Sequence, residues 1–181
     1  EPAQVLAIPI AAGQFTTERL VLDEETTQLL DPEITQRENS LLAAITSPFT
    51  PEVRWDGPFV MPLEGNPAVT SAFGTRRAYN DGAVASYHGG TDFDVALGTK
   101  VTAAAAGVVV LAERLDVRGN AVIVDHGAGV YSMYCHLSHI DTSVGDSVEP
   151  GDLLGLVGST GLSTGPHLHW ELRVQGERVD P

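Results

Sequence analysis

The stretch from Asn120 to His136, NAVIVDHGAGVYSMYCH, contains two runs of apolar, β-branched and aromatic residues on either side of a glycine-rich turn. Residues of this kind favour β-strands, and glycines between the runs favour a reversal of the chain. Similar short runs recur at 101–111, 153–157 and 167–174. The sequence from Phe59 to the C-terminus therefore predicts an all-β fold.

The first 58 residues follow a different pattern. A helix is predicted to begin at Asp31-Pro32, because Asp caps helix N-termini and Pro suits the first turn. Apolar residues then recur at helical spacing, at Ile34, Leu41, Leu42 and Ile45. We expect this apolar stripe to pack against the β domain, and contact with a functional groove of that domain is the less favoured alternative. The sequence thus predicts an N-terminal extension of unknown role with one helix at 1–46, a Pro-rich linker at 47–58 and a β domain at 59–181.

The chain is acidic, with 24 Asp and Glu residues but 10 Lys and Arg residues among 181, a net charge of -14. Nucleic acids bind to cationic patches, so this composition argues against a nucleic-acid partner. No run of about 18 or more apolar residues is present, so no membrane span is predicted. Cys135 is the only cysteine and cannot form an internal disulfide. A chain that opens at Glu1 fits removal of a signal or anchor sequence, or trimming, equally well.

Two short segments carry metal-binding residue types at metal-ligand spacings. His88-Gly89-Gly90-Thr91-Asp92 places an imidazole and a carboxylate four residues apart, and His167-Leu168-His169 places two imidazoles two residues apart. In an extended strand such side chains lie on the same face, so each pair can converge on one point. Three of these four groups would make a catalytic zinc site, with the fourth coordination position open to water or substrate. The remaining group would then be free for acid–base chemistry.

Three other polar residues near these segments are weighed against them. Asp94 shares the predicted strand face of Asp92 and is the rival carboxylate ligand. His126 and His139 fit no ligand spacing, so we interpret both as structural or solvent-facing. None of the three enters the predicted metal site.

The run around His136 contains two further candidates. Tyr134 is interpreted as a packing residue, with donation of a hydrogen bond to a bound carbonyl as the alternative. Cys135 is next to His136, so strand alternation predicts that its side chain points away from the metal. A buried, unreactive thiol is therefore the favoured interpretation of Cys135.

Three motifs together resemble those of the lysostaphin or LytM-type zinc metalloendopeptidases, peptidase family M23, which cut peptide cross-links in bacterial peptidoglycan. They are H-x-G-x-D at 88–92, Y-x-H-L at 134–137 and G-S-T-G-x-S-T-G-P-H-L-H at 158–169. The resemblance runs from about Phe59 to Pro181 in the family's order and spacing. It implies a metallopeptidase domain at 59–181 with an antiparallel β-sandwich or barrel-like fold of the duplicated hybrid motif type, preceded by the small mixed extension.

The resemblance also implies the site residues. The ligands of one Zn²⁺ per chain are then His88, Asp92 and His169, and the catalytic residues are His136 and His167. The chain has no H-E-x-x-H, so the Glu base of the thermolysin-type site is missing. One of the two catalytic histidines would act as general base and the other would stabilise the developing oxyanion, and the sequence leaves open which does which.

The resemblance implies an active peptidoglycan endopeptidase, because all three ligand positions and both catalytic histidines are present. A catalytically silent peptidoglycan-binding or amidase-activating relative is the alternative. A D,D-endopeptidase that acts on direct cross-links is favoured over an enzyme that cuts glycine bridges. These substrates lie outside the cytoplasm, so a secreted, periplasmic or envelope-associated protein is expected.

Two further segments have expected roles near the site. The glycine-rich stretch 158–165 is expected to form a wall of the substrate groove, because glycine permits tight turns and close approach of a ligand. Arg76 or Arg77 is expected to make a structural salt bridge, with recognition of a substrate carboxylate as the alternative. The sequence leaves the oligomeric state open.

Overall fold

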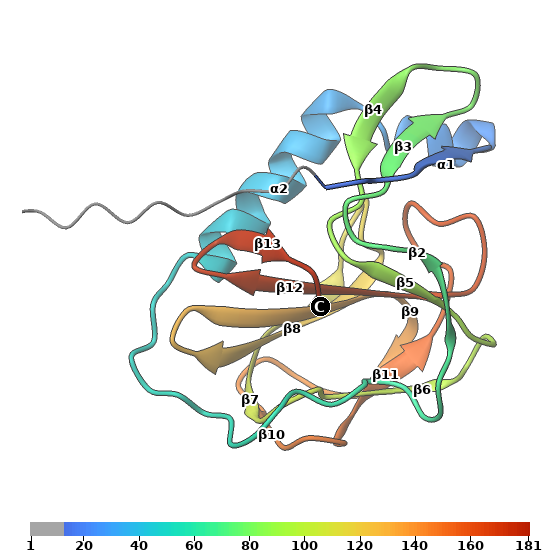
Figure 1. Ribbon diagram of the computed structural model, residues 1–181. Helices are drawn as coiled ribbons and strands as arrows, with labels where there is room; N and C mark the ends of the chain where they lie inside the picture. The colour runs from blue at the N-terminus through green and yellow to red at the C-terminus, as the bar shows by residue number, and fades with distance from the viewer. Residues whose placement is uncertain (1–12) are drawn as a thin grey trace, which may run out of the picture.

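The computed structural model describes residues 13–181, so residues 1–12 of the predicted extension lie outside the described part of the chain. Its main element is a ten-stranded sheet whose principal path runs in the order β10-β7-β8-β9-β12-β5-β2 (Figure 1). All pairings within this sheet are antiparallel. In chain order these strands are β2 (Ala68–Ser71), β5 (Thr91–Asp94), β7 (Gly107–Arg114), β8 (Asn120–Gly127), β9 (Val130–Ile140), β10 (Ser147–Val148) and β12 (Leu168–Val174).

Three more strands extend the sheet and fold it over a core. β11 (Leu153–Val157) pairs with β9 and with β6 (Lys100–Thr102), and β13 (Glu177–Val179) pairs with β12. The first core joins residues of β6, β10 and β11 to residues of β7, β8, β9 and β12, among them Val101, Leu154, Val122, Tyr134 and Leu168. The all-β, antiparallel prediction is confirmed, and within residues 13–181 the strands do not close into a barrel.

The long hairpin of β8 and β9 is buried on both faces, which explains its nearly continuous apolar sequence. Val122 and Val124 belong to the first core, whereas Ala121 and Ile123 belong to a second core on the opposite face. Successive residues of a strand point to opposite faces, so the hairpin divides its side chains between the two cores.

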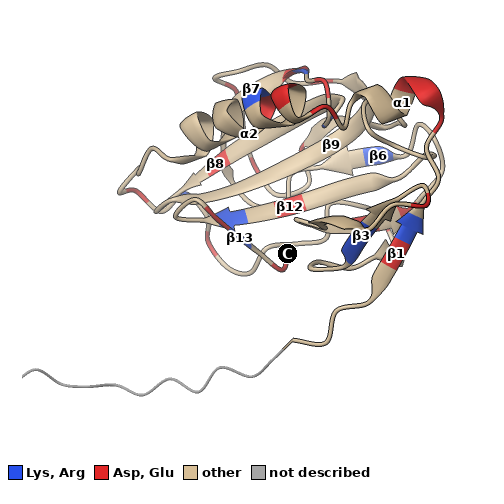
Figure 2. Cartoon of the chain, turned by 90° about the horizontal axis from the view of Figure 1, so that it is seen from above, with Lys and Arg blue, Asp and Glu red and all other residues tan. Residues whose placement is uncertain are grey.

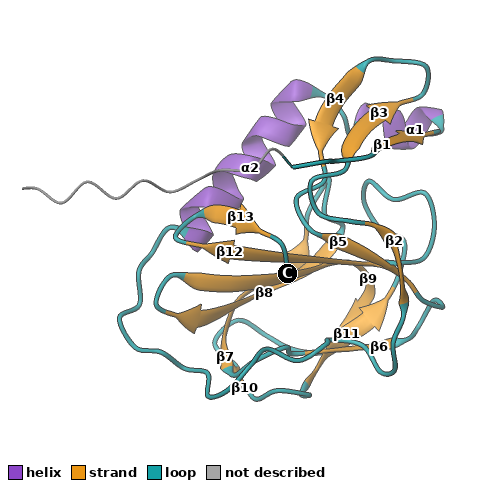
Figure 3. Ribbon diagram, in the orientation of Figure 1, coloured by secondary structure: helices purple, strands orange, loops and turns teal. Residues whose placement is uncertain are grey.

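Helix α2 (Pro32–Thr46) covers the second core (Figure 3). The Asp31 side chain accepts a hydrogen bond from the backbone N–H of Glu33 and caps the helix, as predicted. Leu42 is fully buried among residues of β7, β8 and β9. The predicted packing of the helix on the β domain is therefore confirmed. Leu41 is 40% exposed and does not belong to the stripe, whereas Glu38 is buried on this face.

A small second sheet joins the extension to the middle of the chain. β1 (Thr17–Leu20) pairs in parallel with β3 (Arg76–Tyr79), and β3 pairs antiparallel with β4 (Val84–Tyr87). A short helix, α1 (Glu24–Gln28), lies between β1 and α2, with the acidic residues of its first turn red in Figure 2. The predicted helix of the extension is α2, whereas α1 was not anticipated, because a five-residue helix without buried residues has no apolar periodicity to detect.

Residues 47–58 contain no helix or strand, but they follow the turn between β8 and β9 closely. The Tyr131 hydroxyl donates to Pro48 O at 2.6 Å, and Arg54 N donates to His126 O at 2.9 Å.

Among residues 13–181, the helices are too short or too polar to cross a bilayer.

Candidate metal centre and active site

His88, Asp92 and His169 converge although they are distant in sequence. β5 and β12 are neighbours in the sheet, and Asp92 lies directly opposite His169 in the register, which puts both side chains on one face. Asp92 Oδ1 lies 3.0 Å from His88 Nε2 and 2.8 Å from His169 Nδ1, and the two nitrogens are 2.9 Å apart. All three side chains are buried. The predicted ligand atoms therefore meet at one point.

Groups behind these three side chains fix their orientation. His88 Nδ1 lies 3.1 Å from the carbonyl oxygen of Ala72, which can only accept, so Nδ1 carries the proton and the Nε2 lone pair faces the cluster. Arg77 donates to Asp92 Oδ2 at 2.5 Å, which leaves Oδ1 for the cluster. On the far side of His169, Nε2 lies 3.7 Å from Glu171 Oε2. Outer contacts of this kind are typical of metal ligands.

The donor set fits zinc. Two imidazole nitrogens and one carboxylate oxygen form the group, and catalytic zinc sites combine three such ligands with one open position. Ring nitrogens and a carboxylate oxygen that lie 2.8–3.0 Å apart can direct their lone pairs at one cation between them. The residues present are thus suited to hold Zn²⁺, and the open side of the cluster faces a groove.

The electrostatics of the cluster favour a charged carboxylate. Burial raises the pKa of Asp92, but the neighbouring His169 and His88 outweigh burial and hold this pKa well below its usual range. Burial lowers the pKa of His169, but Asp92 and Glu171 outweigh burial and raise it. Burial is also the main reason that the pKa of His88 is lowered.

His136 reaches the site through an irregularity in β9. Asn120 pairs with Leu137 and Val122 pairs with Tyr134, so β9 has one residue more than β8 between these pairs, which is a β-bulge. His136 has a φ of 61°, in the left-handed region that non-glycine residues rarely adopt. Its backbone N–H donates to Arg118 O at 2.9 Å, which helps to hold this conformation.

The two predicted catalytic histidines have the same tautomer. His136 Nδ1 donates to Thr160 O at 2.7 Å, and His167 Nδ1 donates to Gly165 O at 2.8 Å. Each neutral ring therefore has an unprotonated Nε2. His167 Nε2 lies 3.8 Å from Asp92 Oδ1. The ring centroids of His136 and His167 are 4.8 Å apart. Burial, with smaller effects of His167 and His169, lowers the pKa of His136 well below its ordinary value, so His136 is neutral at pH 7.

The bulge also changes the position of Cys135. Cys135 lies directly opposite His169 in the register, so both side chains lie on the same face of the sheet. The prediction that Cys135 points away from the metal was wrong, because the left-handed His136 interrupts the alternation. Cys135 is nevertheless fully buried, and burial raises the pKa of its thiol well above the usual value. Its interpretation as an unreactive core residue stands.

The other candidates lie outside the cluster. Asp94 is exposed on β5, and among residues 13–181 the metal-binding group consists of His88, Asp92 and His169. The side chain of His139 is 65% exposed, whereas His126 is completely buried. Tyr134 is also fully buried, and its hydroxyl accepts a hydrogen bond from Ala104 N, so it is a packing residue. Burial raises its pKa to about 12.

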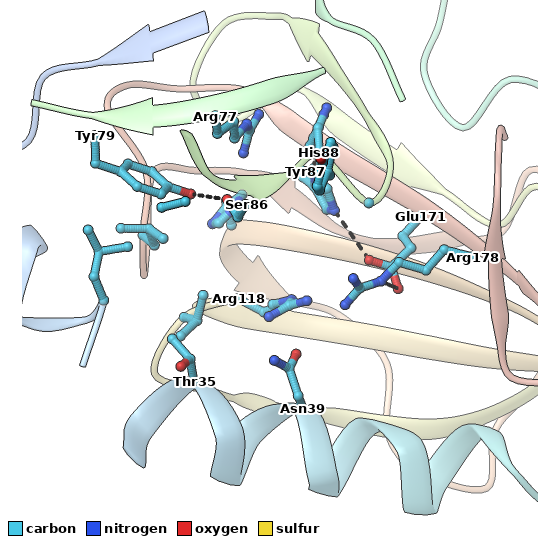
Figure 4. A pocket seen from close by; sticks show the side chains of 17 residues that line it. Thr35, Asn39, Arg77, Tyr79, Ser86, Tyr87, His88, Arg118, Glu171 and Arg178 are labelled. Atoms are coloured by element: carbon cyan, nitrogen blue, oxygen red, sulfur yellow. Dashed lines mark hydrogen bonds and ion pairs between the residues drawn. The ribbon is translucent and has the colours of Figure 1, made fainter. Parts of the chain in front are cut away.

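A groove of about 350 Å³ leads from the cluster to helix α2 (Figure 4). His88, His136 and His169 line one end, and Thr35 and Asn39 of α2 line the other. The expectation that the extension does not contact the groove was therefore wrong: the β3–β4 hairpin and α2 form its two sides. A second cavity of about 220 Å³ is lined by Asp92, His167 and residues 162–166, so the glycine-rich stretch does border the site.

Sequence reasoning missed Glu171, which faces His169 and is bound by Arg173 at 2.6 Å and Arg178 at 3.3 Å. The signal was available, because Glu171 follows His169 by two residues and so lies on the same strand face. The roles of Asn39 and Thr35 carried no such signal, because nothing in their local sequence relates α2 to β3 and β4. Arg77 makes the expected structural ion pair, with Asp92.

Comparison with known proteins agrees with this geometry. The family model described as Peptidase family M23 matches residues 86–181, more than half of the chain. The chain belongs to peptidase family M23. The resemblance inferred from the three sequence motifs is therefore confirmed.

This M23 chain is similar to two curated relatives. It is 46% identical over 94 residues to the DD-carboxypeptidase/endopeptidase Mpg of Neisseria meningitidis, a match that covers 52% of this chain and 22% of that protein. It is 39% identical over 119 residues to the peptidoglycan DD-endopeptidase ShyA of Vibrio cholerae, with 66% of this chain and 28% of that protein covered. The M23 chain thus corresponds to about a quarter of the length of these relatives.

The crystal structure of a zinc-containing peptidase from Vibrio cholerae has a similar fold. It superposes with a TM-score of 0.63 and 31% identity, covering 68% of this M23 chain and 39% of that chain. The fold that surrounds the His-Asp-His cluster is therefore one found in zinc-containing peptidases.

Proposed function

We propose that this chain is a zinc-dependent endopeptidase that hydrolyses peptide cross-links of bacterial peptidoglycan. The convergence of His88 Nε2, Asp92 Oδ1 and His169 Nδ1 within 2.8–3.0 Å of one another is the observation that carries the proposal. These atoms would hold one Zn²⁺ per chain. Bound zinc supplies a Lewis acid that activates water and polarises the scissile carbonyl.

His136 and His167 perform the proton transfers in this proposal. Both neutral rings have an unprotonated Nε2 beside the cluster, fixed by the hydrogen bonds from Nδ1 to Thr160 O and Gly165 O. One ring accepts a proton from the attacking water and later delivers it to the leaving amine. The other ring takes up a proton from solvent at Nε2 before the reaction and donates a hydrogen bond from it to the developing oxyanion. The fixed tautomers mean that neither ring must reorient before it reacts.

The alternative function is a catalytically silent relative that binds peptidoglycan or activates an amidase. Such a protein has no need of proton-transfer groups. The left-handed conformation of His136 argues for activity, because backbone strain of this kind costs of order 1–3 kcal/mol and is concentrated at functional sites. A silent site would have no reason to retain it.

The names of the relatives support a D,D-endopeptidase. We propose that it acts on direct cross-links rather than on glycine bridges. Peptidoglycan as substrate implies action outside the cytoplasm. We assign the activity to residues 59–181 as the metallopeptidase domain, with 47–58 as linker and 1–46 as an extension.

Mass spectrometry of defined muropeptides tests this function. The zinc-loaded chain should cut D-alanyl cross-links, lose this activity after treatment with a chelator and recover it when Zn²⁺ is added. Cleavage of pentaglycine while D-alanyl cross-links stay intact would exclude the D,D assignment. Absence of any cleavage by a protein that holds zinc would favour the silent relative.

A further inference from the structure

The part of the groove between the metal cluster and helix α2 differs in charge from the rest of the molecule. The whole chain has a net charge of -14. Among the described residues that line the groove, however, three are arginines, at 77, 118 and 178, and one is acidic, Glu171. Arg77 pairs with Asp92, so Arg118 and Arg178 give this part of the groove its character.

Both arginines have donors to spare. Arg118 uses Nη1 to bind Glu38 Oε1 at 3.3 Å, and Arg178 uses Nε to bind Glu171 Oε1 at 3.3 Å. A guanidinium has five N–H donors. Within residues 13–181, neither Arg118 Nη2 nor either Nη atom of Arg178 donates a hydrogen bond. Glu171 Oε1 also accepts from Arg173, so this carboxylate is already shared between two arginines.

These unused donors point toward a common space. In Figure 4 the guanidinium groups of Arg118 and Arg178 extend toward each other across the groove, and Asn39 points toward them from α2. The side-chain amide of Asn39 makes no hydrogen bond within residues 13–181 and is exposed. Burial, together with the neighbouring Arg118 and Arg173, lowers the pKa of Arg178, against Glu171, which raises it. Two cations and an amide facing one another favour an anion between them.

We propose that Asn39, Arg118 and Arg178 form an anion subsite that binds a carboxylate of the peptide substrate, on the α2 side of the scissile bond. The subsite rests on the proposed peptidase function, because the same groove contains the metal cluster. A peptide carboxylate is the anion that a peptidase groove meets, and the planar fork of arginine matches it with two parallel hydrogen bonds. The N-terminal extension thereby contributes Asn39 to substrate selection.

The decisive experiment uses two cross-linked muropeptides that are identical except at the free carboxylate of the cross-linking diamino acid, which is amidated in one of them. The zinc-loaded chain should show a kcat/KM at least about 10-fold higher for the carboxylate form, as expected for a charge-assisted pair. In Arg178→Gln this preference should largely disappear, because kcat/KM falls more for the carboxylate form than for the amidated form. Arg178→Lys should keep part of it, and Asn39→Ala should reduce it less.

Arg37→Gln is the matched control. Arg37 is also on α2 and is exposed, but it pairs with Asp116 and does not line the groove. This variant should keep the wild-type preference. Equal cleavage of the two muropeptides by the wild type, or an equal loss on both in Arg178→Gln, would overturn the subsite while the peptidase function remains.

Binding separates failure of the subsite from failure of the function. Fluorescence anisotropy of the same two muropeptides, labelled at the N-terminus, is measured with the His167→Ala chain, in which hydrolysis is suppressed. Tighter binding of the carboxylate form supports the subsite even if the wild type cleaves neither form, a result that would reject the peptidase function alone. Equal affinity for the two forms overturns the subsite.

Discussion

The buried His126 and the buried cluster of His88, Asp92 and His169 differ in where their lone pairs point. His126 donates from Nδ1 to Ala106 O at 2.8 Å, and its Nε2 lies 2.7 Å from Ser132 Oγ, so each ring nitrogen has one neutral partner. In the cluster, His88, Asp92 and His169 direct three acceptor atoms at one another.

The comparison shows that burial of a histidine does not identify a ligand. His126 is buried more completely than His88 or His169, yet its hydrogen bonds are satisfied within the core. A metal site requires convergence of lone pairs that no protein donor satisfies. The predictions below test this difference, from the largest expected effect to the smallest.

The largest effect is expected from removal of a ligand. His169→Ala should lose most bound zinc and reduce hydrolysis by more than the about 10–100-fold that is typical of substitutions behind the ligands. His126→Asn should keep about one zinc per chain. Zinc is measured by elemental analysis of the purified proteins. Full occupancy in His169→Ala would show that the ligand assignment is wrong.

Loss of either catalytic histidine should separate metal binding from catalysis. His136→Ala and His167→Ala should keep zinc but lose a factor of about 100 or more in kcat, because each removes a proton-transfer or oxyanion-stabilising group. Turnover of a defined muropeptide and zinc content are measured on the same samples. His139→Ala, which removes an exposed histidine, is the control and should keep wild-type turnover. Wild-type turnover in His167→Ala would remove this residue from the mechanism.

Helix α2 stabilises the metal-binding side of the sheet through Glu38. The buried Glu38 carboxylate accepts hydrogen bonds from the backbone N–H groups of Val117 and Arg118, at 2.6 and 3.1 Å, and Arg118 O in turn accepts from His136 N. Glu38→Ala should lower the free energy of unfolding by about 2–3 kcal/mol, because it leaves buried donors without acceptors.

Chemical denaturation measures this effect, with the exposed Glu33→Ala as control. We further expect kcat to fall in Glu38→Ala, because the loop that holds His136 loses its anchor. An unchanged free energy of unfolding would mean that Glu38 does not stabilise the packing of α2 on the sheet.

The smallest effect concerns the pH dependence of stability at His126. Burial lowers the pKa of His126 below its ordinary value of 6.5, although Ala106 O and Asp125 raise it. Below pH 6.5 the unfolded chain therefore binds a proton that the folded chain does not, so stability decreases as the pH falls through this window. His126→Gln should reduce that slope.

The measurement is the free energy of unfolding of the zinc-loaded protein at several pH values below 6.5. The exposed His139→Gln should leave the slope unchanged. An identical slope in His126→Gln and wild type would contradict the assignment of His126 as a neutral core residue.

The fold could be predicted from the sequence where strands are long and regularly patterned. The runs at 120–125, 130–136, 153–157 and 167–174 each correspond to a strand, because alternation and glycine turns are local properties. The predicted run at 101–111 is two strands, β6 and β7, which the residues from Ala103 to Ala106 separate. β3 and β4 were not anticipated, because strands of four residues carry little periodicity.

The sequence by itself determined the chemistry of the site. The motifs H-x-G-x-D and H-x-H supply the imidazole and carboxylate groups within a few consecutive residues. The predicted shared strand face does not hold within either motif, because His88 precedes β5 and His167 precedes β12. The capped start of α2 at Asp31 also depends on a few consecutive residues and was predictable.

Only the tertiary structure decided how these local pieces meet. The pairing of Asp92 with His169, the bulge that places His136 beside the site, and the approach of Asn39 to the groove all depend on contacts between distant segments. Such contacts are set by strand register and by the packing of two cores, and a shift of one residue would move every side chain of a strand to the other face. That is why the residues of the site could be named from the sequence, whereas its α2 wall could not.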